Sequence, residues 1–155
     1  MSRTTGVSKK STTTRDDAIS DYRVTEQVGH ILRRASQRHA SIFSSNMVGG
    51  LTPTRFAALA MLLEKGPLSQ NALGRHTAMD IATIKGVVDR LAGKELVSVS
   101  PDPNDGRRHL IELTDKGEKL VSEAIPVGRD ISAETLEMLS HEEQSQLLEL
   151  LRRIS

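Results

Sequence analysis

Residues 68–97, LSQNALGRHTAMDIATIKGVVDRLAGKELV, decide the fold of this chain. Ser69 and Asp80 each carry the side chain of a helix N-cap, and each follows an apolar residue that can pack back onto the helix it starts. The second helix repeats apolar side chains at i, i+3, i+4 and i+7, namely at Ile84, Val87, Val88 and Leu91. Two capped helices joined by a short turn predict a helix-turn-helix whose second helix packs through this apolar face.

The sequence that follows alternates with a period of two. Residues 96–100 and 109–113 are short runs of this type, which predicts two strands. Residues 101–108, PDPNDGRR, lie between them and are rich in turn-forming types. A β-hairpin directly after a helix-turn-helix predicts a winged helix, with residues 101–108 at the tip of the wing.

On the N-terminal side, the apolar spacing of residues 20–47 predicts one long amphipathic helix, in which His39 fills a gap in the apolar stripe. The glycine pair at 49–50 ends this helix. A Thr-Pro pair at 52–53 supplies the N-cap and the first helical position of a second helix, which runs to Lys65 before a Gly-Pro stop.

On the C-terminal side, Thr114 can cap a helix over residues 115–139, which Pro126 and Gly128 are expected to kink or break. A capping box at residues 140–143 starts the last helix. The predicted fold class is therefore mainly α with a small β wing: a winged helix-turn-helix flanked by N- and C-terminal helices.

Composition excludes several classes of protein. The chain has 155 residues and no cysteine, so a disulfide scaffold, a cysteine zinc site and a thiol nucleophile are excluded. No apolar run approaches the roughly 20 residues that span a bilayer, so we expect a soluble, cytoplasmic protein without a membrane partner. The five histidines show no metal-ligand spacing, and no phosphate loop or nucleophile motif is present, so neither a metal nor an enzymatic activity is predicted.

Charge is distributed unevenly along the chain. Residues 1–15 contain eight Ser/Thr, four basic residues and no acidic one, although the formal net charge of the whole chain is only +1. This composition predicts a disordered basic arm over residues 1–18, ahead of a domain over residues 19–155. The arm either contacts DNA phosphates or is a solvated tail. Residues 16–155 contain 17 basic and 20 acidic side chains. The overall charge of this part therefore does not indicate a nucleic-acid-binding protein.

Three segments together resemble the MarR family of bacterial transcription regulators: residues 51–62, LTPTRFAALAML; residues 68–97; and residues 101–120, PDPNDGRRHLIELTDKGEKL. The resemblance covers roughly residues 20–155, and its most specific part is the wing. Within the family, the second-helix and recognition-helix segments are similar to the NicR-like repressors of nicotinic acid degradation, which respond to 6-hydroxynicotinic acid.

The resemblance implies a homodimer on a palindromic operator in double-stranded DNA. Dimerisation helices are expected at about residues 19–48 and 115–155, around a DNA-binding lobe at about residues 51–114. It also implies repression that is relieved by a small aromatic carboxylic acid, such as 6-hydroxynicotinate. The alternatives are a MarR-type regulator of another aromatic-compound or stress-response pathway with a different phenolic effector, and a winged helix that contacts only proteins.

The wing matches the Asp-x-Arg motif of the family as Asp105-Gly106-Arg107. Arg107 at the hairpin tip is expected to enter a narrow minor groove, where the negative potential is enhanced. Asp105 is placed to pair with an arginine and hold its shape, and Arg108 is expected to anchor the wing or contact phosphate. The competing interpretation is an exposed salt bridge in a loop, which contributes only about 0–1 kcal/mol.

The first half of the recognition helix is expected to read base edges in the major groove. Thr83 and Lys85 can form hydrogen bonds there, and Ala82 can contact a thymine methyl group. Many relatives have a long polar residue where Ile81 and Gly86 stand, so base assignments do not carry over residue by residue. Gly86 either allows a close approach of the backbone to DNA or is a tolerated helix glycine.

A candidate effector site follows from the long N-terminal helix. The family places its ligand beside this helix and the start of the next one, which implies a site containing Arg34, Arg38, His39, Phe43 and Thr52. An arginine offers a two-pronged partner for a carboxylate, while the phenyl ring offers an apolar wall and the threonine a hydroxyl group. The alternative for the histidine is a satisfied interface residue without a ligand.

Overall fold

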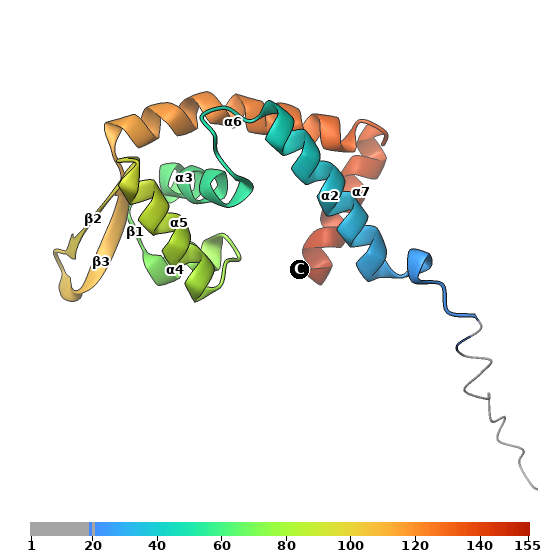
Figure 1. Ribbon diagram of the computed structural model, residues 1–155, viewed down its shortest axis with the longest axis horizontal. Coiled ribbons are helices and arrows are strands. Elements are labelled where there is room, and N and C mark those ends of the chain that lie inside the picture. Colours follow the sequence, from blue (N-terminus) through green and yellow to red (C-terminus); the bar gives the residue numbers. More distant parts are fainter. Residues whose placement is uncertain (1–18, 20) are drawn as a thin grey trace, which may run out of the picture. The chain divides into compact units, whose positions relative to one another are not determined.

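The structure is a computed structural model that describes Ile19 and residues 21–155 (Figure 1). The predicted basic arm, residues 1–18, lies outside the described residues. The chain divides into two units, one up to Ser36 and one from Gln37 to Ser155. No helix in the described part of the chain is both long and apolar enough to cross a membrane.

The first unit contains a short 3-10 helix, η1 (Val24–Glu26), and the beginning of α2 (Val28–Asn46), which continues into the second unit. The prediction of one helix from residue 20 is wrong at its start. Gln27 has extended backbone angles (φ −78°, ψ 140°), and its side-chain amide donates to the carbonyl of Arg23 at 3.2 Å. The chain therefore straightens once before α2 begins.

The second unit contains α3 (Pro53–Lys65) and the predicted helix-turn-helix, which is formed by α4 (Gln70–His76) and α5 (Ile81–Gly93). The three helices begin where the sequence predicts, because the side chains of Thr52, Ser69 and Asp80 each accept the backbone N–H three residues later. Gly66 ends α3 with a φ of 76°, a conformation that glycine adopts at little steric cost.

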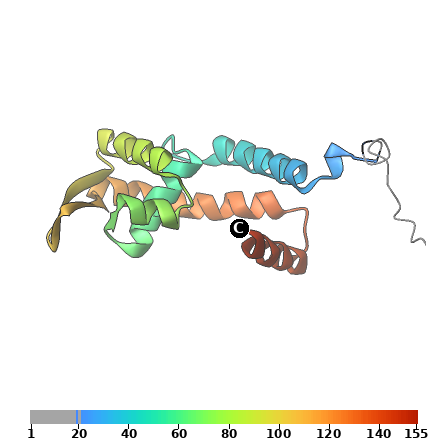
Figure 2. The same ribbon diagram turned by 90° about the horizontal axis from the view of Figure 1, so that it is seen from below.

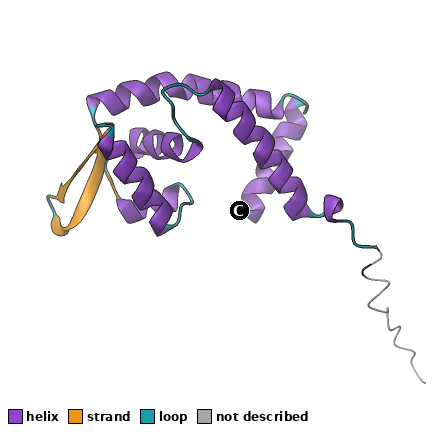
Figure 3. Cartoon of the chain, in the orientation of Figure 1, coloured by secondary structure: helices purple, strands orange, loops and turns teal. Residues whose placement is uncertain are grey.

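Three antiparallel strands complete the lobe: β1 (Leu68–Ser69), β2 (Val97–Asp102) and β3 (Asp105–Leu113), in the order β1-β3-β2. The strands are orange in Figure 3, and Figure 2 shows the β2–β3 hairpin extending beyond the helices as a wing. The predicted eight-residue turn is too long. Because Asp102 pairs with Asp105, the turn is confined to Pro103 and Asn104, and both wing arginines lie in β3.

One hydrophobic core joins the helices of the lobe to the sheet. The predicted inner face of α5 is confirmed, since its four apolar side chains are at most 5% exposed. They pack with side chains from α3, α4, the strands and α6, including Leu59, Leu73, Leu96, Ile111 and Val121. A smaller cluster holds Ile42 and Phe43 of α2 against Ile131 of α6.

The helix α6 (Asp115–Leu136) continues through Pro126, so of the predicted kink or break, the break is wrong. A proline removes one backbone hydrogen bond, here the one to Ser122, and both residues are exposed, so water can satisfy the freed carbonyl. Val121 and Ile131, on either side of the proline, are at most 1% exposed and hold the helix to the two cores.

Glycines let α6 approach its neighbours closely. A β-carbon at Gly128 would lie 2.7 Å from the phenyl ring of Phe56, and one at Gly117 would overlap the carbonyl oxygen of Leu96. Gly128, which was expected to weaken the helix, therefore allows α6 to pack closely against Phe56 of α3.

The last helix is α7 (His141–Ile154), and its predicted capping box is present. The backbone N–H of Ser140 donates to Glu143 at 2.8 Å, and the Ser140 hydroxyl accepts from the backbone of Glu143. Gln144 donates to the carbonyls of Leu136 and Leu139, which fixes the turn between α6 and α7.

Candidate nucleic-acid interface and effector site

A polar groove of about 620 Å³ lies between the start of α4 and the wing. We call it the arginine groove, and it is lined by Ser69, Gln70, Asn71, Arg75, Arg107, Arg108 and His109. The sheet creates it, because β1 immediately precedes α4 and pairs with β3 through Ser69 and Leu110. This register brings side chains that are more than thirty positions apart in the sequence to one surface.

The charge of the arginine groove is positive. Three of its lining side chains are guanidinium groups, and none is a carboxylate. Among the described residues, no carboxylate forms an ion pair with Arg75, Arg107 or Arg108. The groove can therefore accept an external polyanion without first breaking an internal ion pair.

The wing tip is shaped by two aspartates that accept backbone hydrogen bonds. Asp102 accepts the N–H of Asn104 at 2.9 Å, and Asp105 accepts the N–H of Arg107 at 3.1 Å. Among the described residues, Asp105 forms no ion pair with an arginine side chain, contrary to the expectation. Asp105 instead fixes the backbone from which the Arg107 side chain projects.

The outward face of α5 is exposed at Ala82, Thr83 and Lys85. The pKa of Asp80 is lowered, because the backbone N–H of Thr83, and then its hydroxyl, stabilise the carboxylate. Lys85 forms an ion pair with Asp89 at 2.7 Å, one turn further along the helix. Both partners are largely exposed, so this pair contributes only about 0–1 kcal/mol and a phosphate can compete with it.

Gly86 lies beside an arginine that the sequence analysis did not single out. A β-carbon at Gly86 would be 3.6 Å from Nη1 of Arg90, which is an ordinary van der Waals distance. The guanidinium group therefore reaches back by one turn over the glycine. The i, i+4 spacing of the two residues was the available signal.

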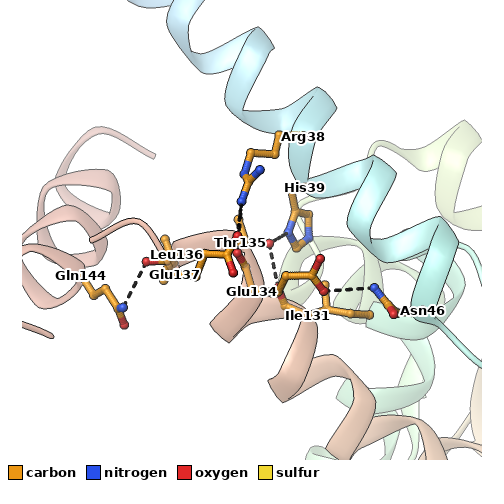
Figure 4. A network of polar contacts seen from close by, with 9 residues as sticks. All are labelled: Arg38, His39, Asn46, Ile131, Glu134, Thr135, Leu136, Glu137 and Gln144. Carbon is orange, nitrogen blue, oxygen red and sulfur yellow. Dashed lines mark hydrogen bonds and ion pairs between the residues drawn. The ribbon is translucent and has the colours of Figure 1, made fainter. Parts of the chain in front are cut away.

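A second group of polar contacts joins α2 to α6, and we call these the α2–α6 contacts (Figure 4). Nδ1 of His39 is 2.9 Å from Oγ1 of Thr135. The Thr135 hydroxyl donates its hydrogen to the carbonyl of Ile131 at 2.7 Å, so it must accept from the histidine. His39 therefore carries a proton on Nδ1, and Nε2 is the ring nitrogen left to recognise another group.

Arg38 and Asn46 complete the α2–α6 contacts. Nη2 of Arg38 is 3.0 Å from Oε1 of Glu137 and 3.3 Å from the carbonyl of Glu134, and Asn46 donates to the carboxylate of Glu134 at 3.2 Å. Figure 4 shows these side chains converging on the last turns of α6. Arg38, which was predicted to bind the carboxylate of the effector, thus already forms an ion pair with Glu137 of its own chain.

Of the other predicted effector residues, Phe43 lies beside His39, whereas Thr52 and Arg34 have other surroundings. Phe43 is buried, with its ring centroid 6.3 Å from that of His39 and 6.0 Å from that of Phe56. Thr52 caps α3 and is 3.2 Å from the hydroxyl of Thr54. Arg34 is exposed and belongs to the first unit. The structure therefore brings Arg38, His39 and Phe43 together.

Comparison with known proteins identifies the family. Residues 51–109 match the model of the MarR family. Over 134 residues the chain is 46% identical to the HTH-type transcriptional repressor NicR of Pseudomonas putida, a match that covers 86% of this chain and 85% of the repressor. The chain belongs to the MarR family. It is accordingly a DNA-binding transcriptional regulator and not an enzyme.

Two solved structures resemble this MarR-family chain closely. A probable transcriptional regulator from Pseudomonas aeruginosa is 47% identical, with a TM-score of 0.84 and coverage of 86% of this chain and 100% of that one. BpsR of Bordetella bronchiseptica is 40% identical, with a TM-score of 0.83 and coverage of 86% and 96%. The BpsR structure concerns regulation of its DNA binding by 6-hydroxynicotinic acid. The predicted family and fold class are confirmed.

Several residues of the arginine groove and the α2–α6 contacts escaped the sequence analysis of this MarR-family protein. Arg75 and His109 enter the groove only through the pairing of β1 with β3. Thr135 and Glu137 meet α2 across a separation of more than ninety residues. The spacing of residues along one helix does not reveal partners on another helix. Only the family resemblance indicated that residues of α2 contribute to the candidate effector site.

Proposed function

We propose that the chain is a homodimeric repressor that binds a palindromic operator in double-stranded DNA and is released by a small aromatic acid such as 6-hydroxynicotinate. The observation that carries the DNA-binding part is the arginine groove beside the exposed face of α5. Similarity to NicR, a repressor, supports the direction of regulation, and similarity to BpsR supports the effector class. Such a regulator acts on the chromosome, in the cytoplasm.

In this proposal α5 enters the major groove and the wing reaches the adjacent minor groove. Thr83, Lys85 and Ala82 lie on the exposed face of α5 and face base edges or phosphates. Arg107 inserts into the minor groove, while Arg108 and the remaining basic side chains of the arginine groove neutralise backbone phosphates. Binding therefore weakens steeply as the salt concentration rises, because counterions are released from several phosphates at once.

Dimerisation is supported by apolar side chains that the described chain leaves exposed. On α7 these are Leu148, Leu150 and Ile154, which are 40%, 55% and 69% exposed. Within the first unit, Val28 and Ile31 of α2 are 66% and 54% exposed. A second copy of the chain can cover both surfaces, and its two recognition helices then read half-sites about one helical turn apart.

The effector site is proposed at the α2–α6 contacts. Nε2 of His39 hydrogen-bonds a ring substituent of the effector, Phe43 provides the apolar wall, and the guanidinium group of Arg38 binds the carboxylate. Thr52 is a further candidate for this site, and a role of Arg34, which belongs to the first unit, stays a prediction. Arg38 exchanges the carboxylate of Glu137 for that of the ligand, and the exchange costs little because both partners of the internal pair are about half exposed.

Release of DNA requires that the effector binds the DNA-free dimer more tightly than the DNA-bound dimer. The α2–α6 contacts are suited to this requirement, since α6 also carries the core of the DNA-binding lobe through Val121 and Ala124. A bound effector that lies between Arg38 and α6 changes how α2 is held against α6, whereas loss of the exposed Arg38–Glu137 pair alone does not. The change alters the spacing of the two recognition helices in the dimer.

The test is a fluorescence-anisotropy titration of the full chain on the promoter fragment beside its own gene, against a scrambled fragment of equal length. We expect preferential binding to the promoter, and release by 6-hydroxynicotinate at lower concentration than by nicotinate or benzoate. Equal binding to both fragments would contradict operator recognition. If only a different phenolic acid releases the DNA, the proposed DNA-binding function stands and the proposed effector is wrong.

The dimer is tested separately by light scattering coupled to size exclusion. We expect twice the chain mass for the parent and the mass of one chain for Leu150→Glu, whose side chain does not contribute to the described cores. Helicity measured by circular dichroism should be retained. A folded Leu150→Glu variant that stays dimeric would place the interface elsewhere.

A further inference from the structure

The start of the recognition helix has an apolar surface where a reader of guanine would have a long polar side chain. Ile81 is the first residue of α5 and is 74% exposed, the highest value for a large apolar residue between 51 and 114. It does not contribute to the hydrophobic core of the lobe. Its side chain therefore has no described structural task that requires isoleucine.

The polar groups near Ile81 are engaged within the chain. The Asp80 carboxylate accepts the backbone N–H of Thr83 at 2.7 Å, and the ammonium group of Lys85 is held by Asp89. Thr83 adds a hydroxyl group to the first turn, whereas Ala82 has only a methyl group. The side chains of Ile81 and Ala82 therefore form a small exposed hydrocarbon surface at the start of α5.

Ile81 also lies next to the positive surface. It lines a slot of about 410 Å³ between α4 and α5 together with Arg75 and Asp80, and Arg75 also lines the arginine groove. DNA whose phosphates enter the groove is thereby held close to the first turn of α5. The occupant of the apolar surface is then a base edge.

Base edges in the major groove differ in one apolar feature. Thymine carries a C5-methyl group there, whereas the other bases present polar donors and acceptors, and apolar side chains discriminate thymine through this methyl group. We infer that Ile81 is a specificity-determining residue that selects a thymine in each operator half-site through contact with its methyl group. This inference rests on the proposed placement of α5 in the major groove.

The test removes the methyl group from the DNA and the side chain from the protein independently. Operator sites are first enriched from a randomised duplex pool by the full chain. Each thymine of the best site is then replaced singly by deoxyuridine, which keeps base pairing and lacks only the methyl group. For the parent protein we expect at least one position in each half-site where the replacement raises Kd about fourfold, the scale for burying one methyl group.

Ile81→Ala should bind the thymine site more weakly and should show no further loss with deoxyuridine at that position. Val99→Ala, which shortens an exposed apolar side chain on β2, is the matched control and should keep the full sensitivity to deoxyuridine. Alanine is a good helix former, and circular dichroism checks that α5 is intact.

The outcomes separate this inference from the proposed function. If no sequence is enriched, sequence-specific DNA binding fails, and the inference fails with it. If a site is enriched but deoxyuridine is neutral at every thymine, only the inference is overturned. It is also overturned if Ile81→Ala keeps the same loss with deoxyuridine as the parent.

Discussion

The arginine groove and the α2–α6 contacts both contain arginine, but they hold it differently. Arg75, Arg107 and Arg108 have no carboxylate partner among the described residues, whereas Arg38 is 3.0 Å from Glu137. DNA can thus bind to the groove without displacing an internal ion pair. An anionic ligand at Arg38 must instead replace a carboxylate that the chain already supplies.

This difference suits the two proposed tasks, which are DNA binding at the arginine groove and effector binding at the α2–α6 contacts. A surface that binds a polyanion gains from charges that are already free of partners, because phosphate contacts then add affinity directly. A switch needs two arrangements of similar free energy, and an exposed ion pair worth about 0–1 kcal/mol can be exchanged by a ligand at moderate concentration. The comparison therefore predicts opposite responses to mutation in the two regions.

The largest expected effect is in the arginine groove. Arg107→Ala should weaken operator binding by roughly 1–3 kcal/mol, the scale of one lost specific contact, and should leave the chain folded because Arg107 is exposed. Anisotropy titration measures the affinity, and circular dichroism confirms the fold. Arg129→Ala removes an exposed arginine of α6 outside the groove and should have little effect. If both variants lose the same operator affinity, the arginine groove contributes only nonspecific positive charge.

The second prediction tests the internal carboxylate. Glu137→Gln removes the charge that competes for Arg38, so DNA release should need about two- to fivefold less effector, which corresponds to an exposed ion pair. Arg38→Ala should shift the release midpoint in the opposite direction, and His39→Ala should follow it. Operator affinity without effector should stay nearly the same in all three variants.

The control for this pair is Asp130→Asn, which neutralises another exposed carboxylate of α6 that forms no ion pair among the described residues. Its release midpoint should match that of the parent. If Glu137→Gln raises the effector concentration needed, then Glu137 assists the ligand and does not compete with it.

The sequence predicts those features that depend on neighbouring residues. The caps at Thr52, Ser69, Asp80, Thr114 and Ser140 are all present, because each joins a side chain to a backbone group three residues away. The inner face of α5 was predictable for the same reason, since helical periodicity alone defines it.

Features that depend on distant contacts were predicted poorly. The short turn of the wing follows from cross-strand pairing of Asp102 with Asp105, and the unbroken α6 follows from packing on both sides of Pro126. The partners of Arg38 and His39 belong to another helix, so spacing along α2 could not supply them. The residue types of the site were predictable, whereas their pairing was not.

Gly86 lies on α5, the helix proposed to enter the major groove. Gly86→Ala should raise the free energy of unfolding by about 0.5–1 kcal/mol, because alanine restricts the unfolded chain and its β-carbon fits beside Arg90. Chemical denaturation measures this change. Gly93→Ala, at the last position of α5, is the control and should gain less. Operator affinity then decides the role of Gly86: a loss indicates close approach of the backbone to DNA, and no loss indicates a tolerated helix glycine.

The smallest expected effect tests an internally held carboxylate at the start of α7. The pKa of Glu143 is lowered, because the backbone N–H of Ser140, and then its hydroxyl, stabilise the charged form. The folded chain therefore binds fewer protons there than the unfolded chain at mildly acidic pH. This contribution to stability is present above the unfolded pKa and is lost as the pH falls through the folded value.

Glu143→Gln keeps a capping-box side chain but does not titrate, so its thermal midpoint should fall less than that of the parent between pH 5.5 and pH 3, both being approximate limits set by the usual pKa of glutamate. Glu142→Gln alters an exposed neighbour outside the capping box and should keep the slope of the parent. Thermal melts followed by circular dichroism across this range give the slopes. If Glu143→Gln and the parent lose stability in parallel, other carboxylates govern acid unfolding, and the capping box acts through its hydrogen bonds alone.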